Sequence, residues 1–378
     1  MENDDFKSLS EIKKIKKDKI NAKFIKIFCA FCFLISIIII IFNKKILNLK
    51  NPLNSSKKHL INFYENKIKD IEFNNRLKLD NIINYYTEML KLYKENLTEF
   101  YIKGRQYIME LAGKNYNDSN IITIQDKLNW LIIHENPENK TNIVDKILLH
   151  EYSKKILGED ICVPIIKIYN NIEEINFTEL PEKFVLKCNH GSGMNILCNN
   201  KSRLNITKTR YLLNKWLNTN FGFKNFEYQY INIKRKIFAE KYLSDDIVDY
   251  KIYCFHGKPK FIRVQKNLIN QTGKLNNYYN LDWSLNEIET GLGSYFVRRP
   301  DLIIEKPKKL NVMIKYAKKL SSFFSFVRVD LYEIENKVYL GELTFTPSNN
   351  IFSNKDYNQS LYLGNMLDIK KNNFPMDK

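Results

Sequence analysis

The sequence predicts an α+β or α/β fold for most of the chain, and two observations support this class. Beyond about residue 120, short runs rich in Val, Ile, Phe and Tyr alternate with helical patterns, which is typical of domains that mix helices with sheets. Of the 378 residues, 44% are hydrophobic and 27% are charged, so the chain can bury a sizeable core. This composition excludes a disordered tail and a small module held together by disulfides.

The expected elements follow one another in a mixed order. Helical periodicity predicts helices at Gln125–His134, Thr141–Leu157, Thr207–Leu217 and Leu310–Leu320. Strand-like runs lie at Lys183–Cys188, Lys236–Glu240, Lys251–Phe255, Pro259–Val264, Phe326–Tyr332 and Lys337–Phe345. We place the N-terminal part of this domain at residues 120–180 and its core at residues 181–370.

A membrane anchor is expected near the N-terminus. Residues 27–42 read IFCAFCFLISIIIIIF, a run of 16 residues without a charge, which is close to the lower limit for a spanning helix. A cleaved signal peptide is the alternative, but the small-residue cleavage motif is missing where the run ends. Residues 1–26 form a basic flanking segment, and residues 43–119 are expected to be helical. That helical segment is either a stalk or a helix packed on its own domain or on a partner.

The net charge bears on whether the protein binds nucleic acid, and the cysteines bear on its redox compartment. The net charge is +18, and residues 1–60 contribute an excess of 8 from 13 lysines against 5 acidic residues. No nucleic-acid-binding motif or dense arginine stripe accompanies this charge, so nucleic acid is not an expected partner. Two of the six cysteines form a CxxC pair, which lies inside the apolar run. The other four lack the spacing of metal ligands. This pattern favours reduced thiols in a protein that faces the cytosol.

A glycine loop follows one of the expected strands. Glycine is scarce, at 12 residues, yet Gly191 and Gly193 stand together in the run His190–Gly193, shortly after Lys187. Such glycines allow positive φ angles and bring backbone N–H groups close to an anion, and Lys187 would add a positive charge to the same phosphates. A plain hairpin turn explains the two glycines about as well. The alternative for His190 is a structural turn residue.

Two strands joined by a turn near Glu335-Asn336 bring charged side chains onto one sheet face. Arg328 and Asp330 share one face of the first strand. Glu342 and Thr344 share one face of the second, so Asp330 lies opposite Glu342 or one residue off, depending on the loop length. Two carboxylates and an arginine in this arrangement suit a Mg²⁺ ion held against nucleotide phosphates. The alternative is a cross-strand arginine–carboxylate pair on a solvated face.

The order of these runs resembles the ATP-grasp superfamily, and within it the TupA-like branch. The runs that carry the resemblance are LPEKFVLKCNHGSGMN, AEKYL, DYKIYCFHGKPKFI, YNLDW, FVRVDLY and YLGELTF. The resemblance covers roughly residues 120–370 and excludes the anchor and the first helical segment. It implies an ATP-grasp fold, in which two α+β subdomains clasp a nucleotide. The branch is named for teichuronopeptide biosynthesis and is associated with bacterial cell-surface polysaccharides.

The resemblance also implies roles for individual residues. Lys146 and Lys187 would contact ATP phosphates, and the loop of His190, Gly191, Ser192 and Gly193 would close over them. The adenine would lie against Glu240, Lys241 and Leu243, and the ribose near one of Asp245, Asp246 and Asp249.

The remaining implied roles concern metal and catalysis. Mg²⁺ would be bound by Asp330, Glu342 and Thr344. The superfamily usually has Asn at the position of Thr344, so the second metal site is open at this point. Arg328 would steady the transferred phosphate. Lys251 and Arg263, which flank a His-Gly-Lys-Pro turn, would supply further catalytic charges.

These roles lead us to expect an ATP-dependent carboxylate–amine ligase that acts through an acyl phosphate. Its expected partners are a cell-surface glycan or glycan precursor with a carboxylate, an amine donor, and the membrane through a single-pass anchor. ATP use and the reduced cysteines favour the cytoplasmic face, although the seven lysines at 13–26 before the apolar run and the five at 44–58 after it weakly favour the opposite orientation. The alternatives are a glycosyltransferase-type enzyme of polysaccharide assembly and a membrane-tethered scaffold with a degenerate nucleotide site.

Overall fold

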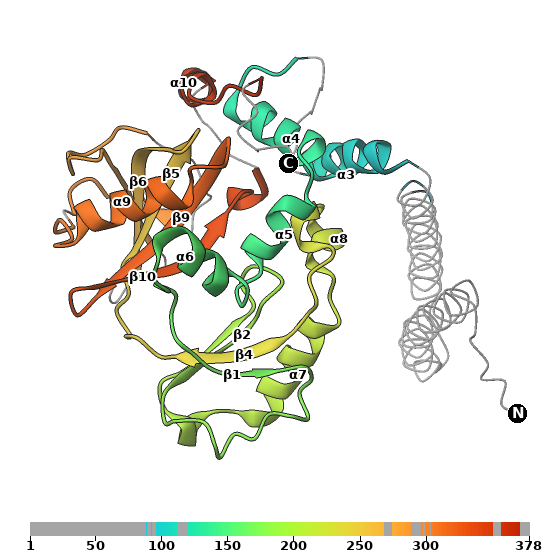
Figure 1. Cartoon of the computed structure of the whole chain (residues 1–378), viewed down its shortest axis with the longest axis vertical. Helices are drawn as coiled ribbons and strands as arrows, with labels where there is room; N and C mark the ends of the chain where they lie inside the picture. Colours follow the sequence, from blue (N-terminus) through green and yellow to red (C-terminus); the bar gives the residue numbers. More distant parts are fainter. Residues whose placement is uncertain are drawn as a thin grey trace, which may run out of the picture. The chain divides into compact units, whose positions relative to one another are not determined.

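Two separate β-sheets carry the fold of the computed structural model (Figure 1). The structure describes residues 88, 92, 96–111, 120–267, 274–288, 296–297, 299–302, 304–350 and 357–370. All of these residues belong to one unit, Thr87–Lys378. The anchor expected at residues 27–42 lies outside the described residues, as does most of the helical segment expected at residues 43–119. No helix in the described ranges has the length and apolarity needed to cross a membrane.

The helices and strands keep the mixed order that the sequence predicts. The helices are α3 (Leu97–Leu111), α4 (Ile124–His134), α5 (Glu138–Val144), α6 (Leu149–Leu157), α7 (Ile206–Leu217), α8 (Phe221–Asn225), α9 (Leu310–Leu320) and α10 (Tyr357–Asn365). Short 3₁₀ turns lie at η1 (Lys201–Arg203), η2 (Tyr228–Tyr230) and η3 (Pro347–Asn350). The strands are β1 (Ile165–Tyr169), β2 (Phe184–Cys188), β3 (Asn195–Cys198), β4 (Ile237–Lys241), β5 (Asp249–Phe255), β6 (Lys258–Asn267), β7 (Lys274–Tyr279), β8 (Phe296–Val297), β9 (Phe326–Ile334) and β10 (Lys337–Thr344).

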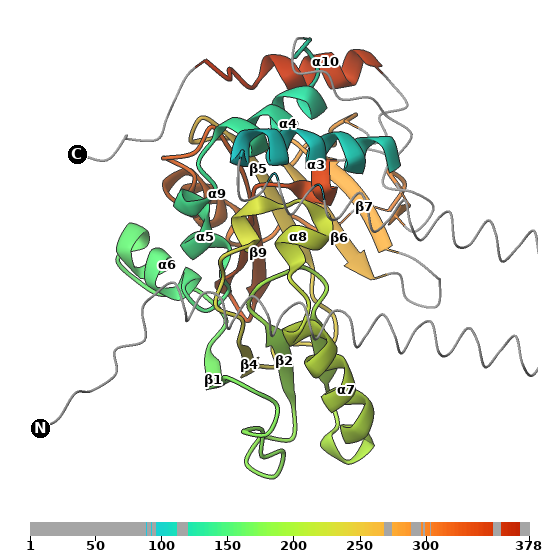
Figure 2. The same cartoon turned by 90° about the vertical axis from the view of Figure 1, so that its right-hand side faces the viewer.

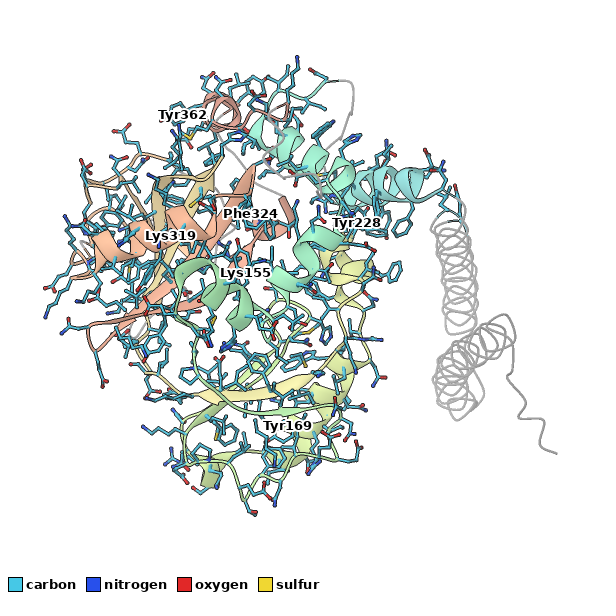
Figure 3. All side chains as sticks on the ribbon, in the orientation of Figure 1. Lys155, Tyr169, Tyr228, Lys319, Phe324 and Tyr362 are labelled. Carbon is cyan, nitrogen blue, oxygen red and sulfur yellow. The ribbon has the colours of Figure 1, made fainter. Side chains whose placement is uncertain are left out.

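The larger sheet has the strand order β10-β9-β5-β6-β7-β8, and every pair except β7–β8 is antiparallel. Its core face packs on α9, which buries Leu310, Met313, Ala317 and Leu320 at helical spacing. Odd-numbered residues of β9, such as Val329, point to this core because strand side chains alternate between faces. The buried ring of Phe324 marks this core in Figure 3.

The opposite face of the larger sheet changes character along its strands. At one end, aromatic side chains such as Phe255 and Phe326 pack beneath α4 and α10, with Leu128 and Leu363 among the buried contacts (Figure 2). Farther along β9 the same face becomes charged. The α4–α10 layer therefore covers only the apolar end and leaves the charged part of the face for a site.

The described end of the first helical segment, α3, packs on α4. The side chain of Arg105 is fully buried there, and its Nε and Nη2 donate to Asn129 Oδ1 at 2.9 and 2.6 Å. Asn129 belongs to α4, so the contact joins two helices. The sequence left open whether this segment is a stalk or a packed helix, and α3 is a helix packed on its own domain.

The smaller sheet has the order β1-β4-β2-β3 and is antiparallel throughout. One face packs on α7, where Phe184, Leu186 and Ile237 meet Leu213. Tyr169, labelled in Figure 3, is buried in this cluster. Side chains of the other parity, among them Lys187 on β2, occupy the opposite face, and that face is left for a site.

A helix predicted to be continuous over Thr141–Leu157 is two helices in the structure, so this prediction was wrong. The break lies between α5 and α6 at Asp145, whose Oδ1 accepts hydrogen bonds from the backbone N–H groups of Ile147 and Leu148 at 2.8 and 3.4 Å. An Asp side chain that bonds to the following backbone competes with helix continuation. The break places Lys146 in a loop, where its side chain can reach the site.

Candidate functional site

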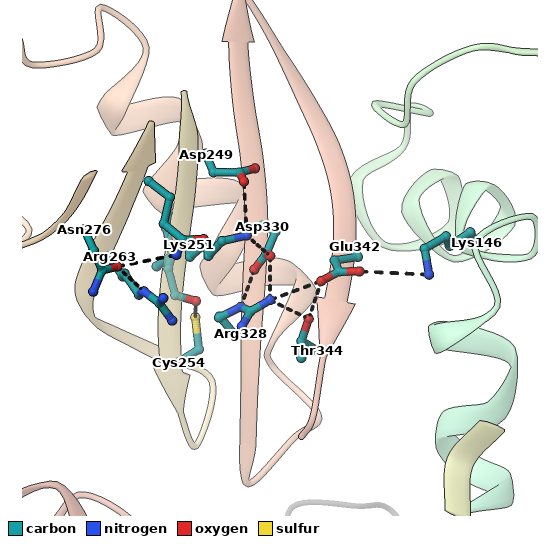
Figure 4. Close-up of polar contacts among 12 residues, drawn as sticks. Lys146, Asp249, Lys251, Cys254, Arg263, Asn276, Arg328, Asp330, Glu342 and Thr344 are labelled. Carbon is teal, nitrogen blue, oxygen red and sulfur yellow. Dashed lines mark hydrogen bonds and ion pairs between the residues drawn. The ribbon is translucent and has the colours of Figure 1, made fainter. Parts of the chain in front are cut away.

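Four charged residues form a row across four neighbouring strands of the larger sheet (Figure 4). Arg263 on β6 pairs with Lys251 on β5, Lys251 pairs with Asp330 on β9, and Asp330 pairs with Glu342 on β10. Cross-strand partners point to the same side of a sheet, so two cations and two carboxylates share one surface. The predicted hairpin and the position of Asp330 opposite Glu342 are both confirmed.

A β-bulge sets this register. The two-residue turn Glu335-Asn336 has φ angles of 52° and 61°, as a tight hairpin turn requires, and from it Leu340 pairs with Leu331. Without a shift, the next pairs would set Gly341 opposite Asp330 and turn Glu342 toward the core. The register shifts between Leu340 and Glu342, so Gly341 is the additional residue. The bulge therefore brings the second carboxylate to the site.

Asp330 holds two cations together. Its carboxylate accepts from Arg328 Nε at 2.6 Å, from Arg328 Nη2 at 2.7 Å and from Lys251 Nζ at 2.6 Å. Asp330 is only 1% exposed, so these charge-assisted bonds lie in a poorly solvated place. Burial lowers the pKa of Lys251, but the charges of Asp330 and Asp249 outweigh it, so the pKa is raised and the amine stays protonated.

Glu342 lies between Arg328 and Lys146. Its Oε1 accepts from Arg328 Nη2 at 3.1 Å and from the Thr344 hydroxyl at 2.9 Å, while Oε2 is 4.0 Å from Lys146 Nζ. Burial raises the pKa of Glu342, but the charges of Lys146, Arg328 and Lys251 lower it more, to about 2. Glu342 is therefore a carboxylate at any physiological pH, with one oxygen turned toward Lys146.

Lys146 extends from the α5–α6 break to the glycine loop. Its Nζ donates to the Gly191 carbonyl at 2.5 Å, and its backbone N–H donates to Asn189 O at 3.3 Å. Asn189 Nδ2 in turn donates to Asp145 Oδ2 at 2.8 Å, which ties the break to the loop. Burial lowers the pKa of Lys146, with Glu342 opposing that change.

In the glycine loop, His190 is buried, and each of the two glycines is required for a different structural reason. His190 is buried, its Nε2 is 3.0 Å from the Trp216 carbonyl, and burial lowers its pKa to about 4, so the imidazole is neutral near pH 7. A Cβ at Gly191 would lie 2.7 Å from the Phe221 ring, whereas Gly193 has a φ of 71°. Ser192 lines a cavity of the described structure that also borders the charged row.

A second cavity, about 160 Å³, lies against the face of the small sheet opposite α7. Lys187 forms an ion pair with Glu240 at its wall, and the exposed Lys241 and half-buried Leu243 continue that wall. These are the residues that the resemblance assigns to the adenine and a phosphate. Of the three candidate ribose acids, Asp249 lines the cavity. Asp245 instead accepts from the Tyr242 hydroxyl, and Asp246 pairs with Lys266 at 2.8 Å.

The larger cavity, about 460 Å³, is lined by three residues of the charged row, and Asp330 lies behind them, outside the lining. Its lining includes Arg263, Lys251, Arg328, Glu342 and Thr344. Asp249 and Gln265 line both cavities, so the two are neighbours.

Sequence reasoning missed part of the wall of this cavity. Glu227, Tyr230 and Thr346 line it beside the charged row. Glu227 and Tyr230 come from a loop and a 3₁₀ turn without strand or helix periodicity, so no local pattern could have found them. The roles assigned above to nucleotide, metal and catalytic residues stay predictions.

The oxygen atoms near Arg328 suit a hard cation. Asp330, Glu342 and the Thr344 hydroxyl offer only oxygen ligands, which Mg²⁺ prefers. Both oxygens of Asp330 already accept from cations, but Glu342 Oε2 has Lys146 no closer than 4.0 Å. The donor set therefore fits Mg²⁺, with Glu342 Oε2 as the most available atom.

The comparisons with known proteins agree with this arrangement. The model of the TupA-like ATP-grasp family matches residues 126–367, nearly two thirds of the chain. No curated protein matches the chain at a significant level. The chain therefore belongs to the TupA-like ATP-grasp family, as the resemblance of its motifs predicted, and the ATP-grasp α+β fold is confirmed.

Several solved structures are distant neighbours. N5-carboxyaminoimidazole synthetase from Staphylococcus aureus, complexed with ADP, has 16% identity and a TM-score of 0.34 over 56% of this chain and 47% of that one. D-alanine–D-alanine ligase from Bacillus anthracis, complexed with ATP, has 19% identity and a TM-score of 0.32 over 61% and 64%. L-amino acid ligase from Bacillus licheniformis has 12% identity and a TM-score of 0.36 over 56% and 45%. The chain thus spans 45% to 64% of the length of these proteins.

Proposed function

We propose that this TupA-like ATP-grasp protein is an ATP-dependent carboxylate–amine ligase. The observation that carries the proposal is the pair of neighbouring cavities: one has the wall expected for a nucleotide, and the other is lined by Arg263, Lys251 and Glu342 of the charged row. Asp249 and Gln265 line both, so a nucleotide in the first cavity would direct its phosphates toward the second.

The residues of the row support phosphoryl transfer by charge and position. Lys146 and Lys187, held by the loop and by Glu240, supply positive charge for a triphosphate. Arg263 and Lys251 stand at the other end of the row, where they would hold a substrate carboxylate for in-line attack on the γ-phosphorus. Arg328, which stays charged because Asp330 raises its pKa against the effect of burial, would stabilise the transferred phosphoryl group.

Mg²⁺ fits this scheme through Asp330, Glu342 and Thr344. When bound, it would neutralise charge on the phosphates. The protein's own contribution is to hold the two carboxylates at fixed positions by hydrogen bonds to Arg328. Glu342 needs no proton release before it binds a cation, because its pKa is about 2.

The cellular role is a further part of the proposal. We infer that the substrate carboxylate belongs to a cell-surface glycan or its precursor, and that a separate amine completes an amide. The support is the family name and the apolar run at residues 27–42, which would hold the enzyme at the membrane as a single-pass protein. The four described cysteines are free and buried, which suits a catalytic domain on the reducing, cytoplasmic side.

Nucleotide binding tests the proposal. Calorimetry on the full chain in detergent, with Mg²⁺ and a non-hydrolysable ATP analogue, should detect binding. The variant Lys187→Gln removes one charge-assisted phosphate contact, worth about 1.5–3 kcal/mol, so affinity should fall roughly 10- to 100-fold. Glu342→Gln should weaken the dependence on Mg²⁺. The matched control is Lys167→Ala on β1, whose ion pair with Glu179 is exposed, and it should bind like the parent.

The outcomes separate the three functions that the sequence left open. Binding that needs Lys187 and Mg²⁺ supports the ligase. Binding of a nucleotide-sugar but not of the ATP analogue would favour the glycosyltransferase-type enzyme instead. A folded chain that binds neither would favour the scaffold and refute the proposal.

A further inference from the structure

A buried carboxylate outside the charged row lines the larger cavity. Glu227 is 7% exposed and precedes the turn η2. The hydroxyl of Thr346 donates to its Oε2, and Gln229 Nε2 donates to the same hydroxyl oxygen at 3.0 Å. Its other oxygen, Oε1, accepts no hydrogen bond from any residue that the structure describes. Because Glu227 lines the cavity, Oε1 is the atom left to receive a ligand.

The groups that face Glu227 come from several elements. Arg105 on α3 and Lys146 at the helix break favour its charged form, while Glu342 on β10 disfavours it; the Tyr230 hydroxyl also lies close enough to interact. Burial is the largest influence and raises the pKa of Glu227 to about 7. A carboxyl with such a pKa can accept and release a proton near neutral pH.

The sheet wall of the cavity carries both signs of charge, with Asp249 and Glu342 beside its cations. The sheet wall presents the cations Arg263, Lys251 and Arg328, which suit a carboxylate or an acyl phosphate. Glu227 lies on a wall formed by other segments, beside Thr346 and Asn225, and it is not paired with any cation in an ion pair among the described residues. An amine arrives protonated and needs a carboxylate. Asp249 and Glu342 already form ion pairs with Lys251 and Arg328, whereas no described cation forms one with Glu227, so Glu227 is the lining carboxylate left for the amine.

We propose that Glu227 binds the amino group of the second substrate and takes its proton during amide formation. This inference rests on the ligase function proposed above and assigns the amine subsite within the same cavity. A protonated amine first donates one proton to Glu227 Oε1. The freed lone pair forms the C–N bond, the C–O bond to phosphate breaks, and phosphate leaves with that electron pair. The second N–H proton leaves with the phosphate, so one acyl phosphate and one ammonium give an amide, hydrogen phosphate and the proton held by Glu227.

Two nucleophiles of different charge test the assignment. The full chain is incubated with ATP, Mg²⁺ and a panel of uronic acids and amino acids, and the acyl phosphate is captured with either hydroxylamine or methylamine. Hydroxylamine is largely neutral at pH 7 and needs no base before attack, whereas methylamine is protonated. Glu227→Gln should slow amide formation by about 10²- to 10⁴-fold and slow hydroxamate formation far less, because hydroxylamine needs no proton removed before it attacks. The control Glu179→Gln, an exposed carboxylate on the small-sheet side, should behave like the parent in both reactions.

The pH profile distinguishes a base from a structural residue. In the parent, methylamide formation should rise and then level off at an apparent pKa near 7. In Glu227→Gln it should start lower and keep rising with the fraction of neutral methylamine, without levelling off near 7. Equal losses with both nucleophiles would overturn the proposal, because Glu227 would then act on the acyl phosphate or on folding. An unchanged methylamide rate would overturn it as well.

A binding measurement keeps the amine subsite testable even if no carboxylate in the panel reacts, an outcome that would count against the ligase function alone. The full chain is labelled with [δ-¹³C]glutamate, and the Glu227 resonance is identified by its absence in Glu227→Gln. Adding methylammonium should lower the pKa of Glu227, read from the pH dependence of that resonance, since a bound cation favours the carboxylate. A Glu227 resonance that does not respond would contradict the proposal.

Discussion

Replacing Asp330 by Ala should destabilise the fold as well as the site. Asp330 is 1% exposed and is the shared partner of two buried cations, Arg328 and Lys251. Alanine removes the carboxylate but leaves both positive charges in place. A loss of turnover in this variant would therefore not by itself show a catalytic role, and Asp330→Asn, which keeps the shape and some hydrogen bonds, is the better catalytic test.

The magnitude follows from the contacts. Three charge-assisted hydrogen bonds at 2.6–2.7 Å are lost, each worth about 1.5–3 kcal/mol in isolation, but bonds within one network do not add. Removing one partner of a buried ion pair costs about 3–5 kcal/mol. Arg328 keeps Glu342 at 3.1 Å and Lys251 keeps Asp249 at 3.4 Å, so the lower end is expected. We predict a loss of about 3 kcal/mol, roughly a 100-fold change in the folded-to-unfolded ratio.

Guanidinium unfolding of the full chain, followed by far-ultraviolet circular dichroism, measures this loss. The control is Asp301→Ala, because Asp301 is exposed and pairs with Arg299 at 2.6 Å; its unfolding midpoint should match the parent. Added salt should change the effect of Asp330→Ala little, since the bonds are buried. A loss below about 1 kcal/mol would refute the reasoning, because the two cations would then not depend on Asp330.

Two further predictions concern the glycine loop. Gly191→Ala should lower the free energy of unfolding by about 1–3 kcal/mol, because its Cβ would lie 2.7 Å from the Phe221 ring. Adding Phe221→Leu to the same chain should recover part of that loss. A Gly191→Ala variant as stable as the parent would contradict the close contact. His190 has a pKa of about 4 in the fold against 6.5 unfolded, so the unfolded chain binds more protons between these values. Stability should rise by about 3 kcal/mol from pH 4 to 6.5 through this residue, and His190→Gln should remove that rise in pH-dependent denaturation; an equal slope in both proteins would disprove it.

Much of the fold was predictable because local rules decide it. The helix at Leu310–Leu320 was placed at its observed bounds, since its apolar spacing persists when the helix packs on the sheet. The turn at Glu335-Asn336 was found because it separates two strand patterns. The break at Asp145 was missed because periodicity does not register a side chain that bonds to its own following backbone. Tertiary pairing of Asp145 with Asn189 then fixes the break.

The site was only partly predictable, for a different reason. Strand alternation placed Arg328, Asp330 and Glu342 on one surface, but the bulge that brings Glu342 into register depends on Gly341, whose role a hairpin pattern does not reveal. The alternation of side chains between the two faces of a strand also says nothing about where loop residues lie. Glu227 therefore enters the cavity wall without any signal in its own neighbourhood.

The charged row balances itself, and this constrains how ligands bind. The carboxylates Asp330, Glu342 and Asp249 pair with the cations Lys251, Arg328 and Lys146, so most of this charge is paired before a ligand arrives. An anion alone or a cation alone would upset this balance, at the cost that unpaired buried charges carry. Phosphate oxygens near Lys146 and a cation near Glu342 Oε2 preserve it together. We therefore expect nucleotide and Mg²⁺ to bind cooperatively, and this coupling follows from the same ion pairs that stabilise the fold.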